Sequence, residues 1–212
     1  MSRAERRPVG VLVSGVGTNL QALIGACEGP DYPARIAAVA SNRPGCPALT
    51  LAADRGIPVV ALPVGGFGGD RVRRDAALAA WLIGHGVELL VCAGYDRILQ
   101  APLLEAFPGG ILNVHPSLLP AFAGGMHAVE AALAEGARET GCTVHLVDDG
   151  GVDAGPIVAQ EPVPILPGDT PERLRARIHE VEWRLLPAAL ASLAARAAPG
   201  SAPGAPAPSR PA

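Results

Sequence analysis

The sequence predicts a doubly wound α/β fold, in which a mostly parallel sheet is flanked by helices. Short apolar runs alternate with amphipathic helical patterns along the chain, as repeated β-α units require. The first run, residues 9–13, is typical of a strand buried on both faces of a parallel sheet. It leads through a glycine-rich turn directly into a helix, which is how many such sheets begin.

Local signals place the individual elements. Strands are predicted where apolar residues run together or alternate, at residues 9–13, 36–40, 59–62, 89–94, 110–115, 143–147 and 157–160. Helices are predicted from about residue 20, over 47–55, over 71–85, up to 107, over 127–135, and from 170 to about 197. Asp70 caps the third helix, Pro171 fills the first turn of the last one, and residues 65–69 are expected to form a flexible loop.

Length and charge limit the classes of protein to consider. The 212 residues suit one domain, predicted over residues 1–198, followed by a Pro/Ala-rich tail at 199–212 that is expected to be disordered. The N-terminal apolar run is interpreted as a strand rather than a signal peptide, and no transmembrane segment is expected. A net charge of −3 gives no reason to expect nucleic acid or membrane as a partner. The choice between monomer and homodimer stays open.

Cysteine and lysine usage narrows the chemistry. Cys27, Cys46, Cys92 and Cys142 are widely spaced and form no CxxC pair, which argues against a zinc or redox motif. Free cysteines fit a reducing cytoplasm, where we expect this protein. The chain contains no lysine. Schiff-base chemistry on a side chain and the P-loop lysine of nucleotide hydrolases are therefore absent.

The turn at residues 14–19, Ser-Gly-Val-Gly-Thr-Asn, has the features of an anion site. It joins a strand to a helix, where free backbone N–H groups and the positive helix end face a ligand. Leu20 occupies the third glycine position of a dinucleotide fingerprint, and the second strand runs into Ser-Asn-Arg rather than an acidic residue. The sequence therefore favours a monophosphate over NAD, with an ordinary tight turn as the alternative.

Asn113 and His115 form the other notable group. They lie two residues apart at the end of a predicted strand, so both point to one face at the edge where open α/β sheets bind ligands. With Asp153 from a later loop at the same edge, they could stabilise an oxyanion and move a proton. A satisfied core histidine is the alternative for His115. His145, inside a predicted strand, is expected to be structural rather than catalytic.

Two rival chemistries fit less well. Ser117 could form a hydrolase triad with His115 and Asp153. However, Ser117 is too close to His115 in the sequence, and the chain lacks a nucleophile elbow there. A metal site of His115, His127 and an aspartate lacks the HExxH spacing, so no metal is expected.

Three arginines, at positions 71, 73 and 74, begin the third helix, where the helix dipole disfavours cations. One of them therefore suits an anionic ligand. A solvated basic face is the default interpretation for Arg73 and Arg74.

Four motifs in this order resemble the folate-dependent formyltransferases. They are Ser-Gly-x-Gly-Thr-Asn-Leu-Gln at 14–21, Ala-Gly-Tyr-x-Arg-Ile-Leu at 93–99, Asn-Val-His-Pro-Ser-Leu-Leu-Pro at 113–120 and Val-Asp-x-Gly-Pro at 152–156. The first motif is similar to that of the family members that act on glycinamide ribonucleotide in purine synthesis. The resemblance runs from about residue 10 to 187 and implies the Rossmann-like, formyltransferase-type version of the predicted fold.

The resemblance also implies an activity and roles for residues. The activity is transfer of a formyl group from 10-formyltetrahydrofolate, as co-substrate, to the amine of glycinamide ribonucleotide. Asn113, His115 and Asp153 match the catalytic residues of the family. The positions that match ribonucleotide-binding residues are Gly17, Thr18, Asn19 and Glu182. The positions that match the folate pocket are Arg71, Arg97, Ile98, Leu99 and the loop that begins at Val147.

The sequence departs from the family at several places. The loops at 121–127 and 148–153 are each one residue longer than usual, Val16 replaces a residue that is commonly polar, and Asp96 replaces one that is usually apolar. Three alternatives stay open: another formyltransferase of the same scaffold, a formyl-folate hydrolase, or a nucleotide-binding module without catalysis. A tRNA formyltransferase would be expected to need an added basic C-terminal domain.

Overall fold

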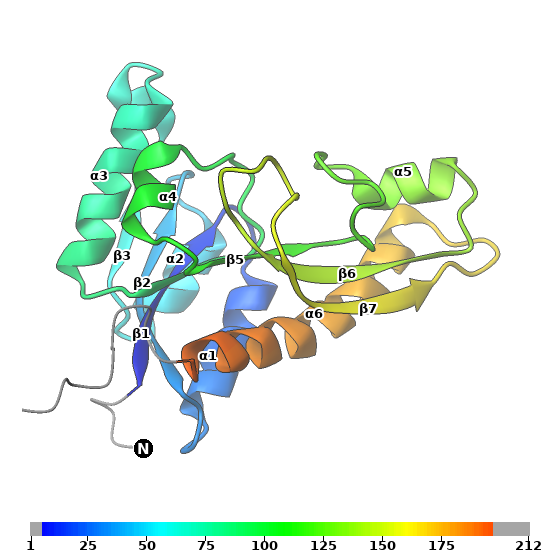
Figure 1. Ribbon diagram of the computed structural model, residues 1–212, viewed down its shortest axis with the longest axis horizontal. Helices are drawn as coiled ribbons and strands as arrows, with labels where there is room; N and C mark the ends of the chain where they lie inside the picture. The colour runs from blue at the N-terminus through cyan, green and yellow to red at the C-terminus, as the bar shows by residue number, and fades with distance from the viewer. Residues whose placement is uncertain (1–5, 197–212) are drawn as a thin grey trace, which may run out of the picture.

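The computed structural model describes residues 6–196, which form a seven-stranded sheet with helices on both faces (Figure 1). The strand order is β3-β2-β1-β4-β5-β6-β7. The predicted doubly wound, mostly parallel α/β fold is confirmed. The predicted tail at 199–212 lies outside the described residues and stays a prediction.

The elements alternate as the sequence pattern predicts. The strands are β1 (Arg7–Val13), β2 (Ala34–Ser41), β3 (Val59–Ala61), β4 (Leu89–Cys92), β5 (Ile111–His115), β6 (Glu139–Leu146) and β7 (Ile157–Pro164). The helices are α1 (Thr18–Glu28), α2 (Pro47–Ala53), α3 (Arg71–Gly84), α4 (Ala101–Ala106), α5 (Ala128–Ala134) and α6 (Pro171–Ala194), with a 3-10 helix η1 (Val64–Phe67).

The predicted helix starts are confirmed by their caps. Asp70 Oδ1 accepts a hydrogen bond from the backbone N–H of Arg73 at 2.9 Å, and Thr170 Oγ1 accepts from that of Arg173 at 3.3 Å. Such caps satisfy N–H groups that have no partner inside the helix. The stretch predicted as a flexible loop at 65–69 differs, because its first part lies in η1.

The last two strands depart from the parallel pattern. β1 to β5 pair in parallel, whereas β6 is antiparallel to both β5 and β7. β6 begins at Glu139 and β7 continues to Pro164, so both are longer than predicted. In the β5–β6 pairing, Asn113 lies directly opposite His145. This register determines which side chains meet at the candidate site.

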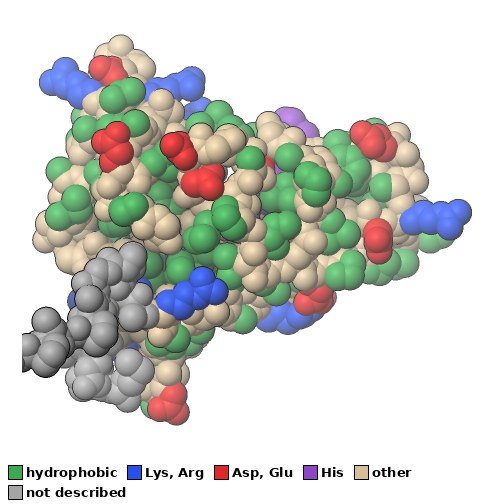
Figure 2. Space-filling view, viewed as in Figure 1, with side chains coloured by type: hydrophobic (Ala, Val, Ile, Leu, Met, Phe, Trp, Pro, Cys, Tyr) green, Lys and Arg blue, Asp and Glu red, His purple; other side chains and the backbone are tan. Residues whose placement is uncertain are grey.

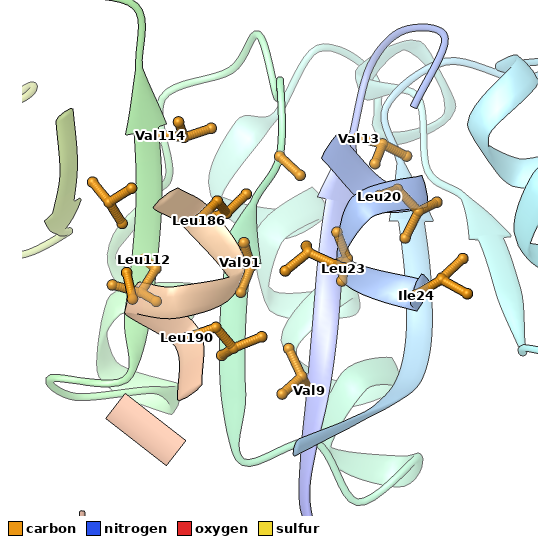
Figure 3. Close-up of a cluster of buried hydrophobic side chains, with 14 of the residues drawn as sticks. Val9, Val13, Leu20, Leu23, Ile24, Val91, Leu112, Val114, Leu186 and Leu190 are labelled. Carbon is orange, nitrogen blue, oxygen red and sulfur yellow. The ribbon is translucent and has the colours of Figure 1, made fainter. Parts of the chain in front are cut away.

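Alternate residues of the central strands feed two separate cores. Val9, Val11 and Val13 pack on the face that α1 and α6 cover, together with Leu186 and Leu190 (Figure 3). The intervening residue Leu12 packs on the other face, against α3 and α4. Burying strands on both faces in this way explains why their sequences are continuous apolar runs.

The same alternation places the polar residues of β5. Leu112 and Val114 belong to the α1/α6 core, while Ile111 belongs to the α3/α4 core. Asn113 and His115 share the parity of Ile111, so their side chains face the α3/α4 side, at the carboxyl end of the parallel strands.

The surface and the helices show few further signals of a macromolecular partner. On the face drawn in Figure 2, basic side chains are scattered among apolar and acidic ones. Among the described residues, no helix combines the length and apolar character required to cross a bilayer.

Candidate active site

Asn113, His115 and Asp153, predicted from separate segments, lie together at the carboxyl edge of the sheet. His115 Nδ1 is 3.3 Å from Asp153 Oδ2, and Asn113 Nδ2 is 3.4 Å from Asp153 Oδ1. The Asp153 and His115 side chains are only 9% and 6% exposed. An amide, an imidazole and a carboxylate within contact distance can polarise a carbonyl and move protons.

Two loops carry this group and contact each other. The backbone N–H of Gly124, in the loop after β5, donates to Asp153 Oδ2 at 2.9 Å. Phe122 and Asp153 have φ angles of 58° and 56°, and they are the only residues other than glycine with positive φ in the described part of the chain. Such conformations are uncommon for residues with side chains and concentrate at functional sites. Both strained residues contact His115.

The neighbours of His115 determine the hydrogen-bond partners of its two ring nitrogens. Nε2 lies 3.0 Å from the carbonyl oxygen of Phe122, and Nδ1 faces Asp153. A carbonyl oxygen only accepts hydrogen bonds, so Nε2 must carry a proton. Oxygen acceptors therefore face both ring nitrogens and fix the orientation of the imidazole.

His145 is a member of the cluster that sequence reasoning missed. Its Nε2 lies 3.1 Å from Asn113 Nδ2 and 3.5 Å from Asp153 Oδ1. Its Nδ1 lies 2.9 Å from the carbonyl oxygen of Leu146, so Nδ1 carries the proton and Nε2 accepts from Asn113. His145 lies inside a strand as expected, and its contacts with Asn113 and Asp153 suit a residue that orients them.

The surroundings of Asp153 keep it ionised. Burial alone would raise the pKa of Asp153. The Gly124 N–H and the neighbouring His115 outweigh burial, so the pKa of Asp153 is lower than usual. The group therefore holds a carboxylate next to an imidazole at neutral pH.

Ser117 is not available as a nucleophile. Its side chain is fully buried and donates a hydrogen bond to the carbonyl oxygen of Ala121. The hydrolase triad considered from the sequence therefore does not form here.

The predicted anion turn lies at the start of α1. Gly17 occupies its N-cap with a left-handed φ of 91°, and a Cβ there would come within 2.7 Å of the Cβ of Ala48. Only glycine fits both constraints. With no side-chain cap at Gly17, the first backbone N–H groups of α1, including those of Thr18 and Asn19, remain available to an anion.

Asn19 joins this turn to Glu182, the other position that matches a ribonucleotide-binding residue of the family. Asn19 Nδ2 donates to Glu182 Oε2 at 2.7 Å, and both side chains are buried. Burial outweighs this hydrogen bond and raises the pKa of Glu182 to about 7. Asn19 Oδ1 is buried without a hydrogen-bond partner among the described residues, so it can accept from a ligand donor.

A cavity of about 250 Å³ collects several arginines beside the carboxyl ends of β2 and β4. Its walls comprise Asn42, Pro63, Val64, Gly65, Arg71, Arg74, Arg97 and Ile98. Arg71 and Arg97 are exposed there, and two such guanidinium groups suit a ligand that carries carboxylates. The predicted folate-pocket residues Arg71, Arg97 and Ile98 are therefore brought together.

Arg74 corrects one expectation. It was interpreted as part of a solvated basic face, but its side chain is only 2% exposed. Its Nε lies 2.8 Å from Asp75 Oδ1, and its guanidinium donates to the hydroxyl of Tyr95. A buried acidic partner in the next position was the signal that could have indicated this burial.

Two other predicted folate-pocket residues lie outside the walls of that cavity. Leu99 is buried in the α3/α4 core, and Val147 packs against the same core, with its N–H bonded to the carbonyl oxygen of Ile111. The walls also do not include the His115 cluster or the Gly17 turn.

Comparison with known proteins agrees with these features. Residues 7–190 match the family described as Formyl transferase. The phosphoribosylglycinamide formyltransferase of Mycobacterium tuberculosis is 48% identical over 187 residues, covering 87% of this chain and 83% of that protein. The corresponding enzyme of Haemophilus influenzae is 41% identical, covering 85% and 84%.

The solved structures agree as well. Glycinamide ribonucleotide transformylase 1 from Symbiobacterium toebii superimposes with a TM-score of 0.86 at 44% identity, covering 91% of this chain and 89% of that chain. Phosphoribosylglycinamide formyltransferase from Brucella melitensis gives a TM-score of 0.83 at 40% identity, covering 91% and 98%. Because the match spans almost all of the described residues, this chain belongs to the formyl transferase family.

Proposed function

We propose that this protein transfers the formyl group of 10-formyltetrahydrofolate to the amine of glycinamide ribonucleotide, a step of de novo purine biosynthesis. Membership of the formyl transferase family and the similarity to enzymes of that name support the substrates. The observation that carries the proposal is the convergence of Asn113, His115 and Asp153 at one buried edge.

The chemistry needs no nucleophile from the protein. The substrate amine attacks the formyl carbon, and the carbonyl oxygen becomes an oxyanion. Once the substrate displaces their present acceptors, His115 and Asn113 can donate hydrogen bonds to that oxyanion, and such donors act strongly in a buried site. The amine then loses a proton, the bond between the formyl carbon and N10 of the folate breaks, and N10 gains a proton. Asp153 is placed to carry that proton directly or through water.

The two substrates occupy different parts of the edge. The Gly17–Asn19 turn, with its free N–H groups, suits the phosphate of the ribonucleotide. Glu182 and the unsatisfied Asn19 Oδ1 can accept from its sugar or glycinamide groups. The arginine-lined cavity suits the carboxylates of the formyl donor, with Ile98 as an apolar surface.

We also propose that the protein works in the cytoplasm on small molecules alone. All four cysteines are free thiols, and burial raises the pKa of Cys92 to about 12, which keeps that thiol unreactive. Fractionation of the native host with an antibody to this chain tests the compartment, and recovery with the membrane fraction would contradict it.

An assay for the folate product tests the activity. Purified protein is incubated with 10-formyltetrahydrofolate in the presence and absence of glycinamide ribonucleotide. Product that depends on the acceptor supports transfer. Equal product without the acceptor would identify a hydrolase, and binding without product would identify a module without catalysis.

A further inference from the structure

Asp96 joins three strand ends beside the candidate site. It follows β4, and its side chain is 9% exposed. Its Oδ1 accepts from Asn42 Nδ2, after β2, at 2.8 Å and lies 3.0 Å from the hydroxyl oxygen of Ser14, after β1. Its Oδ2 accepts from the guanidinium of Arg43, and its own backbone N–H donates to Ser14 Oγ at 3.0 Å. One carboxylate thus connects β1, β2 and β4 at their carboxyl ends.

Two residues held by Asp96 also line the arginine-rich cavity. Asn42 and Arg97 both form part of its walls. Arg97 Nε lies 3.5 Å from Asp96 Oδ1, while the Arg97 side chain is 47% exposed. Within residues 6–196, no other carboxylate lies within 4.0 Å of the Arg97 guanidinium. The direction of this flexible side chain therefore depends on Asp96, and a guanidinium held along one edge keeps its other N–H groups for a ligand.

Asp96 is ionised in this setting. Burial would raise its pKa, but the hydrogen bonds from Ser14 and Asn42 and the charges of Arg43 and Arg97 lower it below the usual value. The carboxylate also takes the place of a residue that the family resemblance predicts to be apolar. An apolar side chain at this position would leave the buried Nδ2 of Asn42 without this acceptor.

We propose that Asp96 is a positioning residue for the formyl donor, which it serves by directing Arg97 and Asn42 toward the cavity. The inference rests on the proposed function, because it assigns the cavity to the donor. Asp96 acts through its neighbours and does not contact the reacting atoms.

The donor rather than the ribonucleotide is expected to respond to changes at Asp96. Ser14, at the root of the anion turn, is also held by its backbone, whose N–H donates to the carbonyl oxygen of Gly94 at 3.1 Å. The turn therefore keeps its backbone position when the side-chain contact is lost. Arg97 has no comparable second restraint among the described carboxylates.

The test is the Asp96→Asn variant, assayed for kcat and for the KM values of both substrates. We expect the KM for the formyl donor to rise about three- to tenfold, while kcat and the KM for the ribonucleotide change by less than about twofold. Glu161→Gln is the matched control, because Glu161 lies on β7 and pairs with Arg184 of α6, and neither residue lines the cavity. It should leave all three constants unchanged.

A double-mutant cycle separates positioning from general structural damage. If Asp96 acts through Arg97, Asp96→Asn should raise the donor KM much less in an Arg97→Gln background than in the wild type. Full additivity would overturn the inference, as would an unchanged donor KM in folded Asp96→Asn.

If Asp96→Asn does not fold, Asp96→Glu provides the measurement, because it keeps the charge and displaces the carboxylate by one methylene. An unchanged donor KM in folded Asp96→Glu would also overturn the inference. Failure of the wild type to transfer formyl would instead overturn the proposed function, so the two failures are distinguishable.

Discussion

Asp153 and Glu182 are two buried carboxyl groups of one candidate site, yet their pKa values shift in opposite directions. Asp153 lies among two histidines and the Gly124 N–H, and its pKa is lowered. Glu182 has one amide partner, Asn19, and burial raises its pKa to about 7. Glu182 is the more deeply buried of the two and has fewer polar partners, so its pKa shifts in the opposite direction.

The difference indicates that one region serves catalysis and the other serves substrate binding. The Asp153 group, with its charged partners, is equipped to stabilise charge and move protons. The Glu182 region, next to the Gly17 turn, offers backbone N–H groups and neutral polar atoms that suit binding. If this division is correct, changes in the first region should lower kcat, and changes in the second should affect KM or pH-dependent stability.

The strongest test of the division is His115→Ala. Loss of an oxyanion donor should lower kcat by about 100- to 1,000-fold, with little change in the KM for the ribonucleotide. Steady-state kinetics and thermal unfolding measure the two effects. His85→Ala is the matched control, since that imidazole lies at the end of α3 against Trp81. A folded His115→Ala variant with near-normal kcat would refute the role of His115.

Asp153→Asn should lower kcat by about 100-fold, because the carboxylate that carries the proton is lost. The lowered pKa of Asp153 determines whether its contribution to stability rises or falls with pH. The contribution of Asp153 to stability is present above the ordinary value of about 3.9 and is lost as pH falls through the lowered value. Profiles of kcat and unfolding against pH should therefore lose an acidic transition in the variant. Profiles that coincide with those of the wild type would count against this assignment.

Glu182→Gln should change the pH dependence of stability in the opposite direction. Because the pKa of Glu182 is raised in the folded state, its contribution to the free energy of unfolding is fully present at pH values below the ordinary pKa of a glutamate. That contribution is lost as the pH rises through about 7. The effect is about 3 kcal/mol for this shift. Denaturant unfolding at pH 4.5 to 8 should show a smaller decline in the variant. Parallel curves would mean that Glu182 titrates normally.

Gly17→Ala should have the smallest effect, about a tenfold rise in the KM for the ribonucleotide, with kcat nearly unchanged. The added Cβ strains the left-handed N-cap and meets Ala48, so the N–H groups move from their positions. Gly25→Ala is the control, because that glycine is also in α1 but has open space at its Cβ position. A larger rise in the donor KM than in the ribonucleotide KM would misplace the phosphate site.

The parallel part of the fold was predictable from sequence because its signals are local. The apolar run of β1, the glycine turn and the cap at Asp70 each depend on a few neighbouring residues. The antiparallel arrangement of β6 was not predictable in this way, since strand direction depends on pairing with β5. The first residue of β6, Glu139, was not predicted for the same reason.

The site shows the same contrast. Asn113 and His115 were found because their spacing and the following proline place them at a strand end. The place of His145 beside Asn113 was not predicted, because only the β5–β6 register brings the two residues opposite each other. Arg74 was misjudged because a first-turn arginine is normally exposed, and its burial depends on Asp75 and on Tyr95 from a distant segment.

The amide of Asn113 has one further consequence. Both of its hydrogens are already engaged, one by His145 Nε2 and one, at the longer distance of 3.4 Å, by Asp153 Oδ1. An incoming substrate oxygen must therefore displace Asp153 to gain a hydrogen from Asn113. Asp153 Oδ1 then loses the hydrogen bond from Asn113 at the step when the attacking amine must lose a proton. Stabilisation of the oxyanion by Asn113 and deprotonation of the amine by Asp153 are therefore coupled.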